Sequence, residues 1–265
     1  MNKKTIQSVF LGMVLLLMYL PILILAVYSF MDSAIIGRSG SFTVKNYVYL
    51  FHSEDLRSMI FGTLILALVV AVISTILGTL GAIGAFYSSK KFKRPIHLMN
   101  QIPVVNADVV TGFSICVLLI VFFKMDKASY VPLVIGLVSL CSPFVYLSVI
   151  PRLKQMDPQL YEAALDLGCS TFGALRKVVL PQLTSGIVSG FMMSITLTLD
   201  DYFITTYTKP SMFDTISTYV VNATKGAQTD VKTALWALST IIFLIVIFVV
   251  IGMNHTGRKE NDHEI

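Results

Sequence analysis

Long runs of apolar residues alternate with short polar segments along this chain of 265 residues. An α-helix rises about 1.5 Å per residue and the hydrocarbon core of a bilayer is about 30 Å thick, so about 20 apolar residues can cross it. Six runs of this kind occur, near residues 7–30, 59–87, 99–123, 131–150, 184–206 and 233–253. The pattern predicts an all-α polytopic membrane protein with six transmembrane helices.

The composition agrees with a chain that lies mostly in lipid. Hydrophobic residues make up 55% of the chain and charged residues 13%, whereas about 25% of the residues in a soluble domain are charged. The net charge of +5 comes from short basic segments beside the apolar runs, and there is no basic domain. We therefore expect membrane lipid, and no nucleic acid, as a partner.

The basic residues predict how the chain is oriented. Positively charged loops stay on the cytoplasmic side of a membrane. Twelve of the 20 Lys and Arg residues form groups close to the apolar runs on one side: Lys3, Lys4, Lys90, Lys91, Lys93, Arg94, Arg152, Lys154, Arg176, Lys177, Arg258 and Lys259. This distribution places both termini and the loop 152–182 in the cytoplasm.

The segment between the fourth and fifth runs contains helix start and stop signals. Asp157 can cap a helix that begins with Pro158, where no backbone donor is needed. Gly168 lies where a left-handed helix stop is expected. Ser170 can cap a second short helix, which we expect to end before Pro181.

The first of these two helices has a surface suited to close contact with another protein. The small side chains of Ala163 and Ala164 make the helix surface flat, so another protein can approach it closely. Tyr161 and Leu165, four residues apart, would form an apolar ridge beside them. Glu162 adds a charge that an Arg or Lys of a partner could engage. The alternative is an ordinary helical hairpin between two membrane spans.

The third run is interrupted by polar residues near its beginning. Pro103 frees a backbone carbonyl, and Asn106 and Asp108 follow within five residues. Broken backbone at membrane depth is tolerated only against protein or a water-filled path. We expect this segment to line a path, or Asp108 to be paired within the bundle.

The fifth run carries two adjacent carboxylates, Asp200 and Asp201, near its outer end. An ionised carboxylate at membrane depth costs at least a few kcal/mol, so such residues usually face a cavity. On a continuous helix the two are about 100° apart, so both cannot face lipid. The aromatic rings of Tyr202, Phe203 and Tyr207 suit a cationic ligand. The alternative is a helix that ends early and leaves the carboxylates as solvated residues or caps.

No set of side chains predicts catalysis or a metal site. The cysteines Cys116, Cys141 and Cys169 lack metal-ligand spacing, and the four histidines form no HExxH or triad-like set. A phosphate-binding loop of Walker type is also missing from the sequence. We expect no catalytic residue, metal or cofactor in this chain, so ATP, if it is used, binds to another subunit.

The punctuated loop resembles a known element. Its landmarks are Glu162, Ala163, Ala164, Gly168, Leu180 and Pro181. This pattern is similar to the EAA loop of bacterial ABC-importer permeases, the cytoplasmic contact through which such a permease receives force from its ATPase. Three further segments extend the resemblance: PVVNADVVTG, LDD before TKPS, and FTVKNY. Together with the loop, they make nearly the whole chain similar to PotC-type permeases of spermidine/putrescine ABC importers, a group of binding-protein-dependent inner-membrane components.

The resemblance implies a type I ABC importer permease fold in the bacterial cytoplasmic membrane. It implies a single transmembrane permease domain over residues 1–265, with the coupling loop at 152–182. The implied partners are a PotB-like permease in a heterodimer, a PotA-like ATPase dimer that binds ATP and Mg, and a PotD-like extracytoplasmic polyamine-binding protein. The implied cargo is spermidine or putrescine.

The resemblance also assigns candidate residues along the substrate path. By position, the acidic sites of the family fall on Asp108, Asp200 and Asp201, with Thr198 one turn earlier. Tyr202 and Tyr207 complete the expected set, and we expect Asp200 rather than Asp201 to face the path. The chain departs from the family at Asn46, where an aromatic residue is common.

Two other kinds of transporter fit parts of the pattern. One is an ABC importer permease for iron, thiamine or an anion, although anionic cargo would favour Lys or Arg within the spans, and they offer none. The other is a stand-alone channel or secondary transporter, which would need no ATPase. An intramembrane enzyme is disfavoured because no paired nucleophile and base is present.

Overall fold

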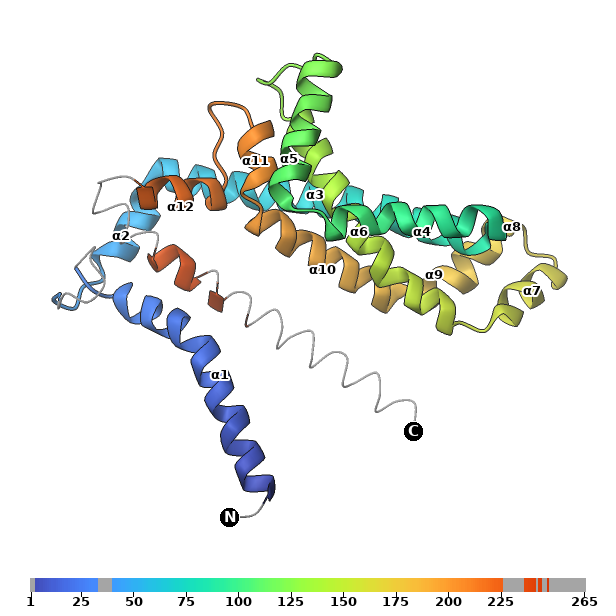
Figure 1. Ribbon diagram of the computed structural model, residues 1–265, viewed down its shortest axis with the longest axis horizontal. Coiled ribbons are helices and arrows are strands. Elements are labelled where there is room, and N and C mark those ends of the chain that lie inside the picture. The colour runs from blue at the N-terminus through green and yellow to red at the C-terminus, as the bar shows by residue number, and fades with distance from the viewer. Residues whose placement is uncertain (1–2, 33–39, 226–235, 242, 245–246, 248–265) are drawn as a thin grey trace. The chain divides into compact units, whose positions relative to one another are not determined.

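The computed structural model describes residues 3–32, 40–225, 236–241, 243–244 and 247 (Figure 1). These residues form helices and no strands, apart from one isolated bridge between Met31 and Phe42. The chain divides into two compact units, Met1–Ser58 with Asn222–Ile265, and Met59–Val221. An all-α fold is confirmed, and a single domain over the whole chain stays a prediction.

The helices follow one another through short connections. Most are α-helices, and two segments, η1 and η2, are π-helical. In chain order they are α1 (Lys3–Tyr28), α2 (Lys45–His52), α3 (Glu54–Tyr87), α4 (Lys90–Val105), α5 (Asp108–Cys116), η1 (Val117–Phe122), α6 (Val131–Gln155), α7 (Pro158–Asp166), α8 (Thr171–Ala174), η2 (Leu175–Val179), α9 (Leu180–Gln182), α10 (Thr184–Asp200), α11 (Phe203–Thr208) and α12 (Ile216–Lys225).

Within the described residues, three helices are long and apolar enough to cross a membrane: Phe10–Tyr28, Glu54–Tyr87 and Val131–Gln155. Two bent pairs could each serve as a further span: Arg94–Val105 with Asp108–Phe122, bent by 107°, and Thr171–Gln182 with Thr184–Asp200, bent by 71°. This gives three to five of the six expected spans. The sixth, near 233–253, falls largely outside the described residues.

The expected third and fifth spans are not continuous helices. The third breaks at Asn106 and Ala107, three residues after Pro103, because the backbone there turns extended between α4 and α5. The side-chain amide of Asn106 donates to the Thr111 hydroxyl at 3.0 Å across this break. The fifth ends at Asp200, six residues earlier than the apolar pattern indicates.

In the first unit, α2 is held against the end of α1 by Asn46. This side chain is only 5% exposed, and its amide donates to the carbonyls of Ser29 and Met31 at 2.8 and 3.0 Å. The Tyr47 hydroxyl lies 2.8 Å from the Ser29 hydroxyl. Asn46 therefore acts as a structural tie within this unit.

In the second unit, α6 is the central helix, packed between α3 and α10. Val145 of α6 is fully buried and lies between two glycines. A Cβ built on Gly78 of α3 would stand 2.6 Å from the Val145 Cβ, and one on Gly190 of α10 would stand 3.0 Å from its Cγ1. The small-residue face of Ser74, Gly78 and Ala82 thus packs closely, as is typical of membrane helices.

Gly78→Val should destabilise the second unit. The added side chain would meet Val145 and the Ser142 carbonyl oxygen, 2.8 Å from the new Cβ, and overpacking of this kind costs about 1–3 kcal/mol. Gly84→Val on the same helix is the control, because a Cβ there has no neighbour within 4 Å in the described structure. Thermal unfolding in detergent should give a lower midpoint for Gly78→Val alone, and equal midpoints would contradict the close contact.

Candidate substrate path and coupling loop

Asp201 forms the break between α10 and α11. Its backbone is extended, with φ −65° and ψ 122°, and the side chain is only 9% exposed. The carboxylate Oδ2 accepts the backbone N–H of Thr205 at 2.7 Å and its hydroxyl at 2.8 Å. One of the donors left open at the start of α11 is thereby satisfied. Asp201 therefore has a capping role, and a continuous helix through Asp200 and Asp201, with its 100° rotation, was the wrong expectation.

Asp108 and Asp200 are both exposed. Asp108 is the first residue of α5, where the helix dipole favours a negative charge. Asp200 ends α10, and its backbone carbonyl accepts the Ser217 hydroxyl at 3.1 Å. Neither carboxylate has a hydrogen-bonded or cationic partner in the described part of the chain. Both remain available to a ligand.

Close packing of α5 on α11 brings Asp108 to the α10–α11 break (Figure 1). A Cβ on Gly112 of α5 would lie 3.1 Å from the backbone nitrogen of Ile204. The rings of Phe113 and Tyr207 meet edge to face, with centroids 5.9 Å apart. Asp108 and Asp201 are close enough for their charges to repel each other. The three acidic residues singled out in the sequence therefore belong to one region.

The nearest basic side chain in sequence, Lys209, does not neutralise these acids. Its Nζ lies 3.0 Å from Oδ1 of Asp214 and donates to the Phe213 carbonyl at 2.8 Å. This is the one ion pair among the residues described. This pair was not predicted from the sequence, although Pro210 is a signal for it, since a turn there folds the two charges together.

The other expected path residues differ in their surroundings. Thr198 is 1% exposed, and its hydroxyl donates to the Ser194 carbonyl at 2.8 Å beside the thiol of Cys141 on α6. It belongs to the packing of α10 on α6. Tyr202 and Tyr207 are half-buried, so part of each residue is exposed.

The caps expected in the loop 152–182 are confirmed. The Asp157 carboxylate accepts the N–H of Gln159 at 2.9 Å at the start of α7. The Ser170 hydroxyl oxygen accepts the N–H of Gly173 at 3.2 Å at the start of α8.

Gly168 ends α7 in the left-handed conformation, with φ +84°. Its N–H donates to the Leu165 carbonyl at 2.9 Å, and the next N–H, of Cys169, donates to the Ala164 carbonyl at 3.0 Å. These two bonds form a Schellman motif. They fix the direction in which the chain leaves Glu162, Ala163 and Ala164.

We expected the second helix of the loop to end before Pro181, and this was wrong. It continues from α8 through the π-helical η2 into α9, which contains Leu180 and Pro181 and ends at Gln182. Proline lacks an N–H and its ring clashes with the carbonyl four residues earlier. The wider π turn accommodates this, since its hydrogen bonds span five residues.

The exposed face of the loop also differs from the expectation. Tyr161 is half-buried, its ring centroid 4.8 Å from that of Tyr87 on α3, and Ala164 is 7% exposed. Glu162, Ala163 and Leu165 are exposed. The most exposed apolar side chains of the loop were not among the predicted contact residues. They are Leu160, Leu167 and Phe172, which are 44, 87 and 73% exposed.

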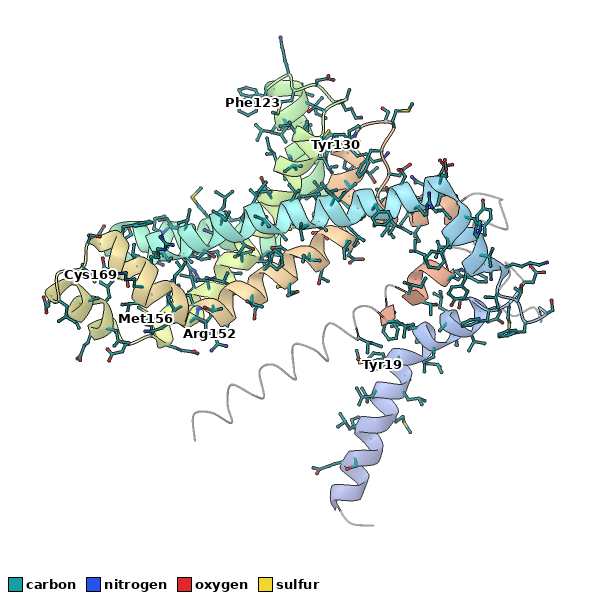
Figure 2. All side chains as sticks on the ribbon, turned by 180° about the vertical axis from the view of Figure 1, so that it is seen from behind. Tyr19, Phe123, Tyr130, Arg152, Met156 and Cys169 are labelled. Carbon is teal, nitrogen blue, oxygen red and sulfur yellow. The ribbon has the colours of Figure 1, made fainter. Side chains whose placement is uncertain are left out.

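Figure 2 shows Arg152, Met156 and Cys169 at the same end of the second unit, with Phe123 and Tyr130 together away from it. The loop and the Phe123–Tyr130 segment therefore occupy separate parts of this unit.

A family model described as "Binding-protein-dependent transport system inner membrane component" matches residues 77–256. This is well over half of the chain. The chain belongs to this family. It is a permease subunit of an ABC importer. The family consists of inner-membrane transport proteins and not of catalytic enzymes. This match confirms the family resemblance predicted from the sequence.

Curated relatives of this permease cover almost its whole length. It is 28% identical over 245 residues to the spermidine/putrescine transport system permease protein PotC of Escherichia coli (strain K12), covering 92% of this chain and 90% of that one. The Haemophilus influenzae PotC is 27% identical over 261 residues, covering 98% and 100%. The putrescine transport system permease protein PotI of Escherichia coli (strain K12) is 28% identical over 238 residues, covering 85% and 81%.

Solved structures show the same fold. The permease resembles a chain of a bacterial ABC transporter that imports the acidic polysaccharide alginate, with a TM-score of 0.71, 16% identity, and 95% of both chains covered. A chain of an alginate ABC transporter bound to its pentasaccharide-loaded periplasmic protein gives a TM-score of 0.70 and 17% identity, covering 92% and 91%.

Asp201→Ala should lower the free energy of unfolding of this permease by about 1–2 kcal/mol, because it removes both bonds to Thr205 at the start of α11. Asp200→Ala, one residue earlier and exposed, should change it little. Unfolding in detergent measures both variants. An equal loss of unfolding free energy in Asp201→Ala and Asp200→Ala would contradict the capping role of Asp201.

Proposed function

We propose that this permease imports polyamines, spermidine or putrescine, driven by a separate ATPase. The observation that carries the proposal is the pair of exposed carboxylates, Asp108 and Asp200, brought to one region by α5 and α10 without a neutralising cation in the described structure. The relatives named for spermidine and putrescine transport support it.

The chemistry of a polyamine fits this region. Its ammonium groups are separated by apolar methylene segments, so separate carboxylates can each bind one group. Asp108 and Asp200 would supply those contacts. The half-buried rings of Tyr202 and Tyr207 would attract an ammonium through their faces and cover the methylene segments.

A permease for another small solute is the second candidate, and an anion fits least well. An anionic cargo needs a free basic side chain near the path, and Lys209 is already bound to Asp214. A stand-alone channel or secondary transporter would have no use for the exposed apolar face of the loop. Whether spermidine or putrescine is preferred depends also on the second permease subunit.

We place the loop 152–182 and both termini in the cytoplasm, as the basic residues predict. The loop would receive a PotA-like ATPase dimer, which binds ATP and Mg. Exposed apolar side chains mark contact surfaces, so Leu160, Leu165, Leu167 and Phe172 would meet the ATPase around Glu162. A PotB-like permease would complete the membrane part, and a PotD-like protein would deliver the polyamine from outside.

Contacts behind α7 explain how motion of the ATPase would reach the membrane helices. Tyr161 lies against Tyr87, the last residue of α3. The same side chain packs on a core cluster that includes Leu153 and Met156, at the end of α6, and Leu183 before α10. A displacement of α7 would therefore move the ends of α3, α6 and α10 together.

Asp200→Asn should lower uptake of labelled spermidine about tenfold to a hundredfold, since a charged hydrogen bond contributes roughly 1.5–3 kcal/mol. Asp108→Asn should act in the same direction, and each change should affect the triamine more than the diamine. Asp55→Asn, an exposed carboxylate in the first turn of α3, is the control. Wild-type uptake by both path variants, at normal amounts in the membrane, would refute cationic cargo and leave an ABC permease for another solute.

Gly168→Val should abolish stimulation of the ATPase, because a β-branched residue is strained at φ +84° and would misdirect the chain after α7. Gly168→Asn is the control at the same position, since Asn tolerates the left-handed region. Cargo-stimulated ATP hydrolysis by the purified complex should be lost in the first and largely kept in the second. Normal stimulation with Val at this position would remove the loop from the coupling mechanism.

A further inference from the structure

A cavity of about 330 Å³ opens between the end of α3, the first half of α4 and the end of α6. Three basic side chains, Arg94, His97 and Lys154, line it. It lies at the end of the second unit that carries α7, since its lining residue Ile150 belongs to the same core cluster as Leu153 and Met156. The substrate path described above uses none of these residues.

The positive charge in this cavity is not neutralised by the rest of the described chain. Arg94 and Lys154 are exposed and form no ion pair there. His97 also lines the cavity, and its Nε2 is 3.3 Å from the side-chain nitrogen of Gln101. The sequence places Lys90, Lys91 and Lys93 just before Arg94. An anion is the ligand that this charge would bind.

Part of the cavity lining is apolar. Ala85 and Phe86, in the last turn of α3, and Ile150 of α6 form this apolar wall. Tyr146 also lines the cavity and is 2% exposed, and its hydroxyl has no hydrogen-bond partner among the described residues. The cavity thus combines basic groups, apolar side chains and the side chain of a tyrosine.

We propose that this cavity binds the headgroup and upper acyl region of an anionic phospholipid. Arg94 and Lys154 would hold the phosphate through charge-assisted hydrogen bonds, the Tyr146 hydroxyl would donate to an oxygen of the headgroup, and Phe86 and Ile150 would contact the apolar part. A free phosphate could satisfy the charges but would leave the apolar wall without a contact.

The position of the cavity along the helices fits this ligand. Two membrane-crossing helices, α3 and α6, end next to it, at Tyr87 and Gln155. With the orientation given under the proposed function, this is the cytoplasmic leaflet, where anionic lipids gather and where basic pockets between membrane helices bind their headgroups. The site rests on that orientation but not on the identity of the cargo.

Native mass spectrometry of the purified complex, released from bilayers of phosphatidylglycerol and phosphatidylcholine, tests the proposal. The wild type should retain phosphatidylglycerol in preference to phosphatidylcholine. The double variant Arg94→Gln/Lys154→Gln should lose about a hundredfold of this retention, since each of its two charge-assisted contacts is worth about one decade. The double variant Arg176→Gln/Lys177→Gln removes the same charge from the exposed surface of η2 and should retain lipid as the wild type does.

Three results would overturn the proposal. These are equal retention of the two lipids by the wild type, unchanged retention in Arg94→Gln/Lys154→Gln, and an equal loss in both double variants. Adding inorganic phosphate distinguishes a phospholipid headgroup from a soluble phosphate as the bound anion. Millimolar phosphate should leave bound phosphatidylglycerol in place, and displacement of the lipid would assign the site to a soluble phosphate instead. None of these readouts depends on polyamine transport, so the proposed function can fail separately.

Discussion

Lipid offers no hydrogen bonds, and every break in a membrane helix must therefore be satisfied by the protein itself. The bond from Thr205 to the Asp201 carboxylate meets this requirement where α10 ends and α11 begins. Between α4 and α5 the Asn106 side-chain amide bonds to the Thr111 hydroxyl, which ties the end of α4 to the first turns of α5. At these two breaks α5 and α11 turn out of the directions of α4 and α10, and they pack on each other.

The close packing of α3, α6 and α10 holds the acidic region in place. Association of helices in a membrane depends on close van der Waals contact, and here Gly78 and Gly190 let α3 and α10 approach Val145 of α6 from two sides. The acidic region lies where α10 ends, and the loop 152–182 joins α6 to α10. The same helices therefore carry the side chains that would bind cargo and the loop that would receive the ATPase.

Local signals in the sequence were sufficient to predict much of this arrangement. Asp157, Gly168 and Ser170 act on neighbours within a few residues, so their caps could be predicted without the fold. Within the described residues, the apolar runs predicted where the long helices lie, and the third and fifth runs were wrong as continuous spans. Asp200 is exposed and Asp201 is buried, and the assignment of Asp200 to the substrate path stays a prediction.

The features that could not be predicted depend on contacts between distant segments or on competing local geometries. Whether Asp201 continues a helix or caps the next one depends on the packing of α11 against α5, through Ile204 and Gly112. Tyr161 could face a partner or the core, and the end of α3, far away in sequence, supplies Tyr87 to stack on it. The π turn before Pro181 leaves no mark in the apolar pattern, because the helix keeps its direction through it.

The central claim is that this permease admits a polycation when a separate ATPase drives it. The most direct measurement is the initial rate of labelled spermidine accumulation in proteoliposomes that contain the whole complex, with the binding protein outside and ATP either enclosed or omitted. The account predicts accumulation against the spermidine gradient only when ATP is enclosed. Accumulation at the same rate without ATP, or no accumulation by a complex that hydrolyses ATP in response to another solute, would contradict it.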